Sequence, residues 1–103
     1  MGLDSYFYSS EIKGEMLYMS KCYPIHDWFV ALLPDSDENK KYSDVNSYTL
    51  SNDDLDKLIR KLLNDEFELE GYDYNHNGQY DKLLGKLVRA RAKGFTIRYS
   101  GGC

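Results

Sequence analysis

The sequence predicts an α+β domain in which a small, mostly antiparallel sheet is covered by about three amphipathic helices. The sheet is expected to combine an N-terminal hairpin, one short strand and a C-terminal strand. Two observations predict this class: three internal segments repeat their apolar residues with a helical period, and aromatic-rich segments stand at both ends of the chain. The 103 residues suffice for one domain and not for two. We therefore expect a single domain at residues 1–100 and a flexible C-terminal tail at residues 101–103.

The first third of the chain predicts a hairpin followed by a helix. The segments "LDSYFYSS" (3–10) and "MLYMSKC" (16–22) are rich in aromatic and apolar residues, and Gly14 between them suits a turn. In "YPIHDWFVALLP" (23–34) the apolar side chains recur at the spacing of one helical face. Pro34 then ends this helix, because proline cannot donate a backbone hydrogen bond.

The middle of the chain predicts a loop, a short strand and the clearest helix. Residues 35–46 lack an apolar repeat and are expected to be a solvated loop, followed by a short strand at 47–50. The helix at 51–66 begins at Ser51, a residue type that caps helix N-termini well. Residues 67–78 are expected to be a connection.

The last third predicts a helix and the final strand. The helix spans about 79–93 and ends at Gly94, a residue type favoured just beyond helix C-termini. In "FTIRYS" (95–100) apolar and polar residues alternate, as in a strand with one buried face. The expected core takes its residues from the apolar stripes of the three helices and from this strand: Trp28, Phe29, Leu32, Leu58, Ile59, Leu62, Leu84, Leu87 and Ile97. Leu63 and Val88 lie on the same helical stripes.

Charge and hydropathy indicate a soluble protein with segregated charge. The net charge is −4, residues 35–81 carry thirteen acids and five bases, and residues 82–103 carry six bases and no acid. The acidic middle and basic end are expected to attract each other across the fold. No apolar run reaches membrane-spanning length, and the N-terminus has no signal-peptide pattern, so we expect a cytoplasmic protein with no membrane partner.

Residues 73–84 have part of the pattern of an EF-hand calcium loop. The matching positions are occupied by Asp73, Asn75, Asn77, Gly78 and Asp81. Position 12, which should be a bidentate glutamate, is Leu84, and two of the oxygen-bearing side chains are neutral amides. We therefore interpret the segment as a turn in which Asn77-Gly78 bends the chain, and expect no metal and no cofactor.

Two further groups of residues invite a chemical interpretation. His26 stands next to Asp27, but neighbours in a helix do not face each other, so we expect His26 to be a hydrogen-bonded, half-buried structural residue and assign no catalytic residue. The basic run at 82–98, with aromatics nearby, could contact nucleic acid. Direct nucleic-acid binding is disfavoured because the chain as a whole is acidic.

The acidic stretch around residues 65–74 is the favoured binding surface. It places five carboxylates within nine residues and adds aromatic side chains, which supply binding energy when desolvated. Such charges also speed association with a basic partner. The residues assigned to partner binding are Asp65, Glu66, Phe67, Glu68, Glu70, Tyr72, Asp73 and Tyr74.

Four segments, in order, resemble a family of small, uncharacterised phage and prophage proteins. They are "MGLDSYFY", "YPIHDWFV", "YTLSNDDLDKLIRKLL" and "GYDYNHNGQYDKLLGKL". The family opens with MGLDMY and carries an Ile-His-x-Trp-Phe segment. Ser5 stands where the family usually has Met, and the ending "YSGGC" replaces an aromatic one. The resemblance implies a phage origin and no mechanism.

Together these observations favour a phage-encoded accessory protein without enzymatic activity. We expect it to bind and inhibit a host protein or protein–nucleic-acid complex, such as a CRISPR or restriction defence complex, in the cytoplasm of an infected or lysogenic cell. The binding surface would be the acidic, tyrosine-rich stretch. Two alternatives stay open: a small enzyme that depends on a metal or on His26, and a nucleic-acid-binding module that uses the basic C-terminal helix.

Overall fold

A computed structural model describes residues 3–20, 23–42, 44–64, 66–67 and 79–102. The order of elements is ββααβααβ. The strands are β1 (Asp4–Ser9), β2 (Glu15–Ser20), β3 (Val45–Thr49) and β4 (Ile97–Gly102). The helices are α1 (Tyr23–Leu32), α2 (Glu38–Lys41), α3 (Asn52–Leu63) and α4 (Gln79–Lys93). The α+β prediction is confirmed.

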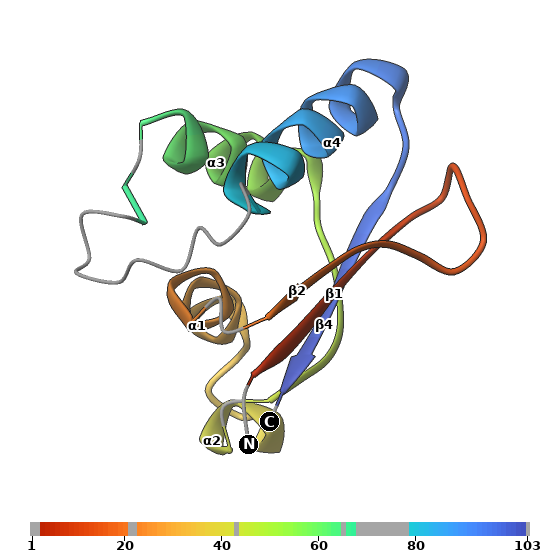
Figure 1. The fold of residues 1–103 in the computed structure, drawn as a ribbon. Coiled ribbons are helices and arrows are strands. Elements are labelled where there is room, and N and C mark those ends of the chain that lie inside the picture. Colours follow the sequence, from red (N-terminus) through yellow and green to blue (C-terminus); the bar gives the residue numbers. More distant parts are fainter. Residues whose placement is uncertain (1–2, 21–22, 43, 65, 68–78, 103) are drawn as a thin grey trace.

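One antiparallel sheet holds all four strands in the order β2-β1-β4-β3. The two termini therefore supply the central pair, because β1 and β4 run side by side from Asp4–Gly102 to Ser9–Ile97. Helices α1, α3 and α4 all lie on the same side of the sheet (Figure 1). The fold is thus two layers, with one covered face and one open face of the sheet.

The core lies between the covered face and the helices. It combines inward residues of the strands with the apolar stripes of α1, α3 and α4. Of the core residues that the sequence predicts, the buried ones are Phe29, Leu58, Leu62, Leu87 and Ile97, and the partly buried ones are Trp28, Leu32, Ile59 and Leu84. Leu63 and Val88 are exposed, although they lie on the expected stripes. The two helices therefore bury narrower faces than the periodicity predicts.

The helix and turn signals are confirmed where they can be compared. Ser51 caps α3 and forms a reciprocal capping box with Asp54. The Tyr48 hydroxyl donates to the same Asp54 carboxylate at 2.8 Å, which ties β3 to the start of α3. Gly14 in the hairpin turn and Gly94 after α4 both have positive φ, at 82° and 79°, a conformation that glycine adopts without strain.

The structure corrects the sequence-based expectations at two places. The loop expected at 35–46 contains the single-turn helix α2 and the first residues of β3. Gly101 and Gly102, expected to be a flexible tail, belong to β4 and pair with β1, and Gly101 also faces Val45 of β3. The reason is that β4 has neighbours on both sides, so its backbone hydrogen bonds hold residues whose own strand propensity is low.

Candidate functional site

His26 lies in the core, where it joins a buried hydrogen-bond network. Its Nδ1 is 2.7 Å from the Tyr99 hydroxyl, and that hydroxyl is 3.0 Å from Ser5 Oγ. His26 is only 3% exposed, and Ser5 and Tyr99 are fully buried. The expectation of a hydrogen-bonded histidine is confirmed, and the side chain is buried more deeply than the half-burial that the sequence predicts. Because solvent does not reach these three groups, their arrangement orients the core and offers no site for a substrate.

The network is held by close packing against one face of the Tyr99 ring and around its hydroxyl end. Phe29 stacks on that ring at 3.9 Å between centroids, with an interplanar angle of 4°. Gly101 leaves room for the phenol, because a Cβ at this position would collide with the Tyr99 hydroxyl and lie 3.0 Å from His26 Nδ1. A glycine is therefore required at this position near the end of β4, which explains why a residue of low strand propensity occurs within the strand.

The opposite face of the sheet carries an aromatic cluster in which Tyr18 and Arg98 are exposed and Tyr6 and Tyr8 are half-buried. This open-face cluster consists of Tyr6, Tyr8, Tyr18 and Arg98. Tyr6 and Tyr18 face each other across β1 and β2, with ring centroids 5.2 Å apart. The Tyr18 hydroxyl donates to the Asp4 carboxylate at 2.5 Å, and the Tyr18 side chain remains 43% exposed. The cluster therefore presents aromatic rings on a rigid sheet, with one of them fixed in orientation.

Arg98 adds a cation to this cluster. Its guanidinium carbon lies 4.2 Å from the Tyr8 ring centroid, within cation–π distance, and its Nη1 donates to Ser47 at 3.4 Å. No carboxylate among the described residues forms an ion pair with it. A hollow of about 260 Å³ adjoins Arg98 and Tyr8, and its other lining residues are small, hydroxyl-bearing or on the hairpin turn. This volume falls below the roughly 300–1,000 Å³ of small-molecule sites.

The acidic surface predicted from the sequence can be assessed at only two residues. Glu66 is exposed, as a binding surface requires. Phe67 is 1% exposed, in edge contact with the Tyr80 ring and under the Lys61 ammonium group. Its assignment as an exposed anchor is wrong, since the ring is used in the core. The other assigned residues lie outside the described residues: Asp65, Glu68, Glu70, Tyr72, Asp73 and Tyr74.

Half of the calcium-like loop also lies outside the described residues. Residues 73–78 are not described, Asp81 is exposed in the first turn of α4, and Leu84 is half-buried against the core. Leu84 therefore occupies the apolar position that the sequence assigns to it. Within the ranges that the structure covers, no group of three or more His, Cys, Asp or Glu side chains is placed to hold a metal ion.

The basic C-terminal segment forms ion pairs with the acidic middle of the chain and with the N-terminal hairpin. Arg91 donates to Asp56 of α3 at 2.9 Å, which agrees with the expected attraction between the acidic middle and the basic end. Arg89 instead reaches Glu11 in the hairpin turn, with its Nη2 2.7 Å from the carboxylate. This hydrogen bond lowers the pKa of the Glu11 carboxyl, against an opposing effect of desolvation.

Comparison with protein families, with curated proteins and with solved structures finds no match to this chain. In the part of the chain that the structure describes, no helix is both long enough and apolar enough to cross a membrane. Sequence reasoning missed the open-face cluster, although a signal for it was present. In "DSYFYS" the tyrosines occupy alternate positions on either side of the buried Phe7, so they share the face opposite to it.

Proposed function

We propose that this chain is a phage-encoded accessory protein that binds and inhibits a host factor, in a CRISPR or restriction defence complex, without catalysing a reaction. The observation that carries the proposal is the open-face cluster, Tyr6, Tyr8, Tyr18 and Arg98. Tyrosine and arginine are enriched among the interface residues that contribute most of the binding free energy, because both combine a large flat surface with hydrogen-bonding groups.

The cluster favours a protein partner over a small substrate. Its aromatic rings lie on neighbouring strands of one rigid sheet, so little conformational entropy is lost when a partner covers them. The adjoining hollow, at about 260 Å³, is suited to a partner side chain more than to a free ligand of ordinary size. The described histidine that sequence reasoning considered for catalysis is in the core. These features support binding as the activity.

The acidic stretch at residues 65–74 is the second part of the proposal. Its five carboxylates would attract a basic host partner and orient it before the tyrosines make contact. A triple variant in which lysine replaces Glu66, Glu68 and Glu70 should therefore associate more slowly with the partner, and its association should depend less on salt. A triple variant whose association rate matches that of the wild-type protein would remove the acidic stretch from the proposal and leave the open-face cluster in it.

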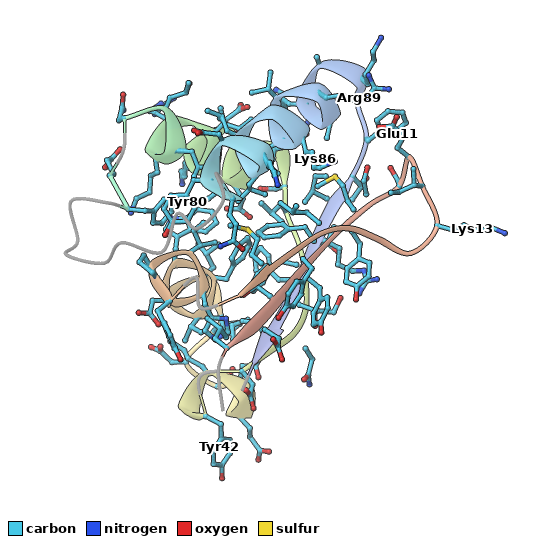
Figure 2. The ribbon with its side chains drawn as sticks, in the orientation of Figure 1. Glu11, Lys13, Tyr42, Tyr80, Lys86 and Arg89 are labelled. Atoms are coloured by element: carbon cyan, nitrogen blue, oxygen red, sulfur yellow. The ribbon has the colours of Figure 1, made fainter. Side chains whose placement is uncertain are left out.

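A defence assay tests the proposed function. The chain is expressed in bacteria whose CRISPR or restriction system blocks a test phage, and the efficiency of plating is measured. We expect plating to rise with the wild-type chain, and to fall back with a Tyr6→Ala/Tyr18→Ala variant. Tyr42→Ala is the matched control, because Tyr42 is 69% exposed and lies at the opposite end of the molecule from the hairpin turn (Figure 2).

Two results would contradict the proposal. One is a wild-type chain that leaves plating unchanged in every CRISPR and restriction strain tested. The other is a soluble double variant that restores plating as well as the wild-type chain and the Tyr42→Ala control do. The same extracts, probed for the tagged protein, show whether the variant is present at the level of the wild type.

A further inference from the structure

A basic ridge runs along the exposed side of α4. Four cationic residues are separated by four, three and four positions, the spacing that places side chains on one helical face. They are Lys82, Lys86, Arg89 and Lys93, and all four are exposed. At 1.5 Å per residue the ridge is roughly 16 Å long. It stands on a chain whose net charge is −4, so it is a local reversal of the overall charge.

The ridge carries more positive charge than the described carboxylates around it pair with. Arg89 is paired with Glu11, and Figure 2 shows the two side chains pointing toward each other from α4 and the hairpin turn. Lys82, Lys86 and Lys93 form no ion pair with a carboxylate of the described residues. The positive charges of Lys86 and Lys93 also act on Glu11, so these two lysines and Arg89 lie close enough to act on the same carboxylate. A partner here must bring negative charge.

An apolar hollow opens beside this ridge. It lies between α4 and the hairpin, has a volume of about 150 Å³, and is lined by Ser9, Glu11, Ile12, Met16, Lys86 and Arg89. Ile12 is 50% exposed, although an isoleucine gains free energy from burial. Met16 adds a flexible thioether side chain that adapts to different shapes. The volume is about half that of the smallest small-molecule pockets, so it suits a single apolar side chain.

We propose that this groove, formed by the α4 ridge and the hairpin turn, binds an acidic segment of a partner protein that contains an apolar side chain. The carboxylates of the segment pair with Lys86, Arg89 and Lys93, and its apolar side chain enters the hollow against Ile12. An extended segment of about five residues matches the length of the ridge. The groove contains none of the four residues of the open-face cluster, although its hollow shares Ser9 and Ile12 with the hollow beside Arg98 and Tyr8. The inference does not depend on the proposed function.

The apolar lining residues Ile12 and Met16 distinguish this partner from nucleic acid. A phosphate backbone would use the lysines alone and gain nothing from Ile12, whereas a peptide uses both. The Arg89–Glu11 pair makes the proposal more specific. Because Glu11 occupies part of the Arg89 guanidinium with 2.7 Å and 3.2 Å hydrogen bonds, an incoming carboxylate competes with it. Removing the Glu11 charge should therefore strengthen binding.

The test uses the full chain and fluorescent 12-residue peptides in which Glu and Asp alternate with Leu and Phe. Two control sets replace the acids with Lys or the apolar residues with Ser, and a single-stranded and a duplex DNA oligonucleotide complete the panel. We expect dissociation constants on the order of 10 μM for the acidic–apolar peptides, and binding at least about tenfold weaker for both control sets. Added salt should weaken the binding.

Variants locate the binding in the groove. Lys86→Glu/Lys93→Glu and Ile12→Ser should each reduce peptide affinity about tenfold, and Glu11→Gln should raise it about threefold. The matched controls are Lys57→Glu, an exposed lysine of α3, and Leu63→Ser, an exposed leucine at the end of α3. The gain from Glu11→Gln cannot be mimicked by a variant that fails to fold.

Three results would overturn the proposal. They are acidic–apolar peptides that bind no more tightly than about 1 mM, an Ile12→Ser variant that binds them as the wild type does, and an oligonucleotide that binds more tightly than every peptide. None of these results bears on the defence assay, because that assay is read through Tyr6 and Tyr18. The two proposals can therefore fail separately.

Discussion

Tyr99 and Tyr18 both project from the same antiparallel sheet, one toward the helices and the other toward solvent. The Tyr99 ring is fully buried, stacks on Phe29, and shares its hydroxyl with His26 and Ser5. The Tyr18 ring is exposed, faces Tyr6, and uses its hydroxyl to hold a surface carboxylate. The pleat of the strands thus separates two groups of tyrosines: Tyr99 packs in the core on the covered face, whereas Tyr18 on the open face stays accessible for the partner contact that we propose.

The largest expected effect is on the covered face. Phe29→Ala removes a fully buried ring that contacts Phe7, Trp28 and Tyr99. The free energy of unfolding should therefore fall by about 3–5 kcal/mol. Chemical denaturation followed by circular dichroism measures this loss. A loss under about 1 kcal/mol would mean that the aromatic stack adds little to stability.

The next effect concerns the buried hydroxyl alone. Tyr99→Phe keeps the ring and its stacking, but leaves His26 and Ser5 without the oxygen that bridges them. A buried polar group left without its hydrogen-bond partner destabilises the fold by about 1–3 kcal/mol, and we expect Tyr99→Phe to lower the free energy of unfolding by that amount. Ser5→Ala in the same background should then cost less than Ser5→Ala alone, because its hydrogen bond to Tyr99 is already gone. Strictly additive losses would show that the network does not act as a unit.

Tyr48 gives a smaller effect that depends on pH. Burial and the hydrogen bond to Asp54 raise the pKa of this phenol from 10.0 to about 12. The folded-state pKa lies above the unfolded value. The stabilisation of the fold by the neutral Tyr48 phenol is therefore complete below pH 10 and is lost as the pH rises through about 12. Tyr48→Phe should cost about 1 kcal/mol at pH 8, and the difference from the wild type should vanish toward pH 12. A difference that is constant over this range would contradict the assignment.

The smallest stability effect is expected on the open face. Tyr6→Ala/Tyr18→Ala removes a cross-strand aromatic pair, and such pairs contribute roughly 0.2–1 kcal/mol. The same denaturation experiment should therefore show an unfolding midpoint close to that of the wild-type protein. A loss comparable to that of Phe29→Ala would mean that the two faces do not divide stability and contact as described.

The parts of the fold that follow local rules could be predicted from the sequence. Ser51 and Gly94 mark one end each of α3 and α4 because capping depends on a few neighbouring residues. The strand at residues 101–102 could not be predicted, since its cause is non-local: β4 lies between β1 and β3, and the Tyr99 phenol needs the space that Gly101 leaves.

The candidate site was harder to predict than the fold. Periodicity indicates that Phe7 and Tyr8 point to opposite sides of β1, but it does not indicate which side the helices cover. The density of acidic residues at 65–74 led to the prediction of a binding surface there. Phe67, the first aromatic residue of that stretch, nevertheless belongs to the core. A dense local pattern was visible in the sequence, whereas a cluster assembled from β1, β2 and β4 becomes visible only once the strand order is known.

A binding measurement with matched variants, made on the host protein that the proposed function requires, tests the division between the two faces most directly. Tyr6→Ala/Tyr18→Ala, Tyr99→Phe and Tyr42→Ala are compared by titration calorimetry at a temperature where circular dichroism shows all three to be folded. We predict that the open-face variant binds at least about tenfold more weakly, while Tyr99→Phe and Tyr42→Ala bind as the wild type does. Full affinity in the open-face variant, or a tenfold loss in Tyr99→Phe, would contradict the account.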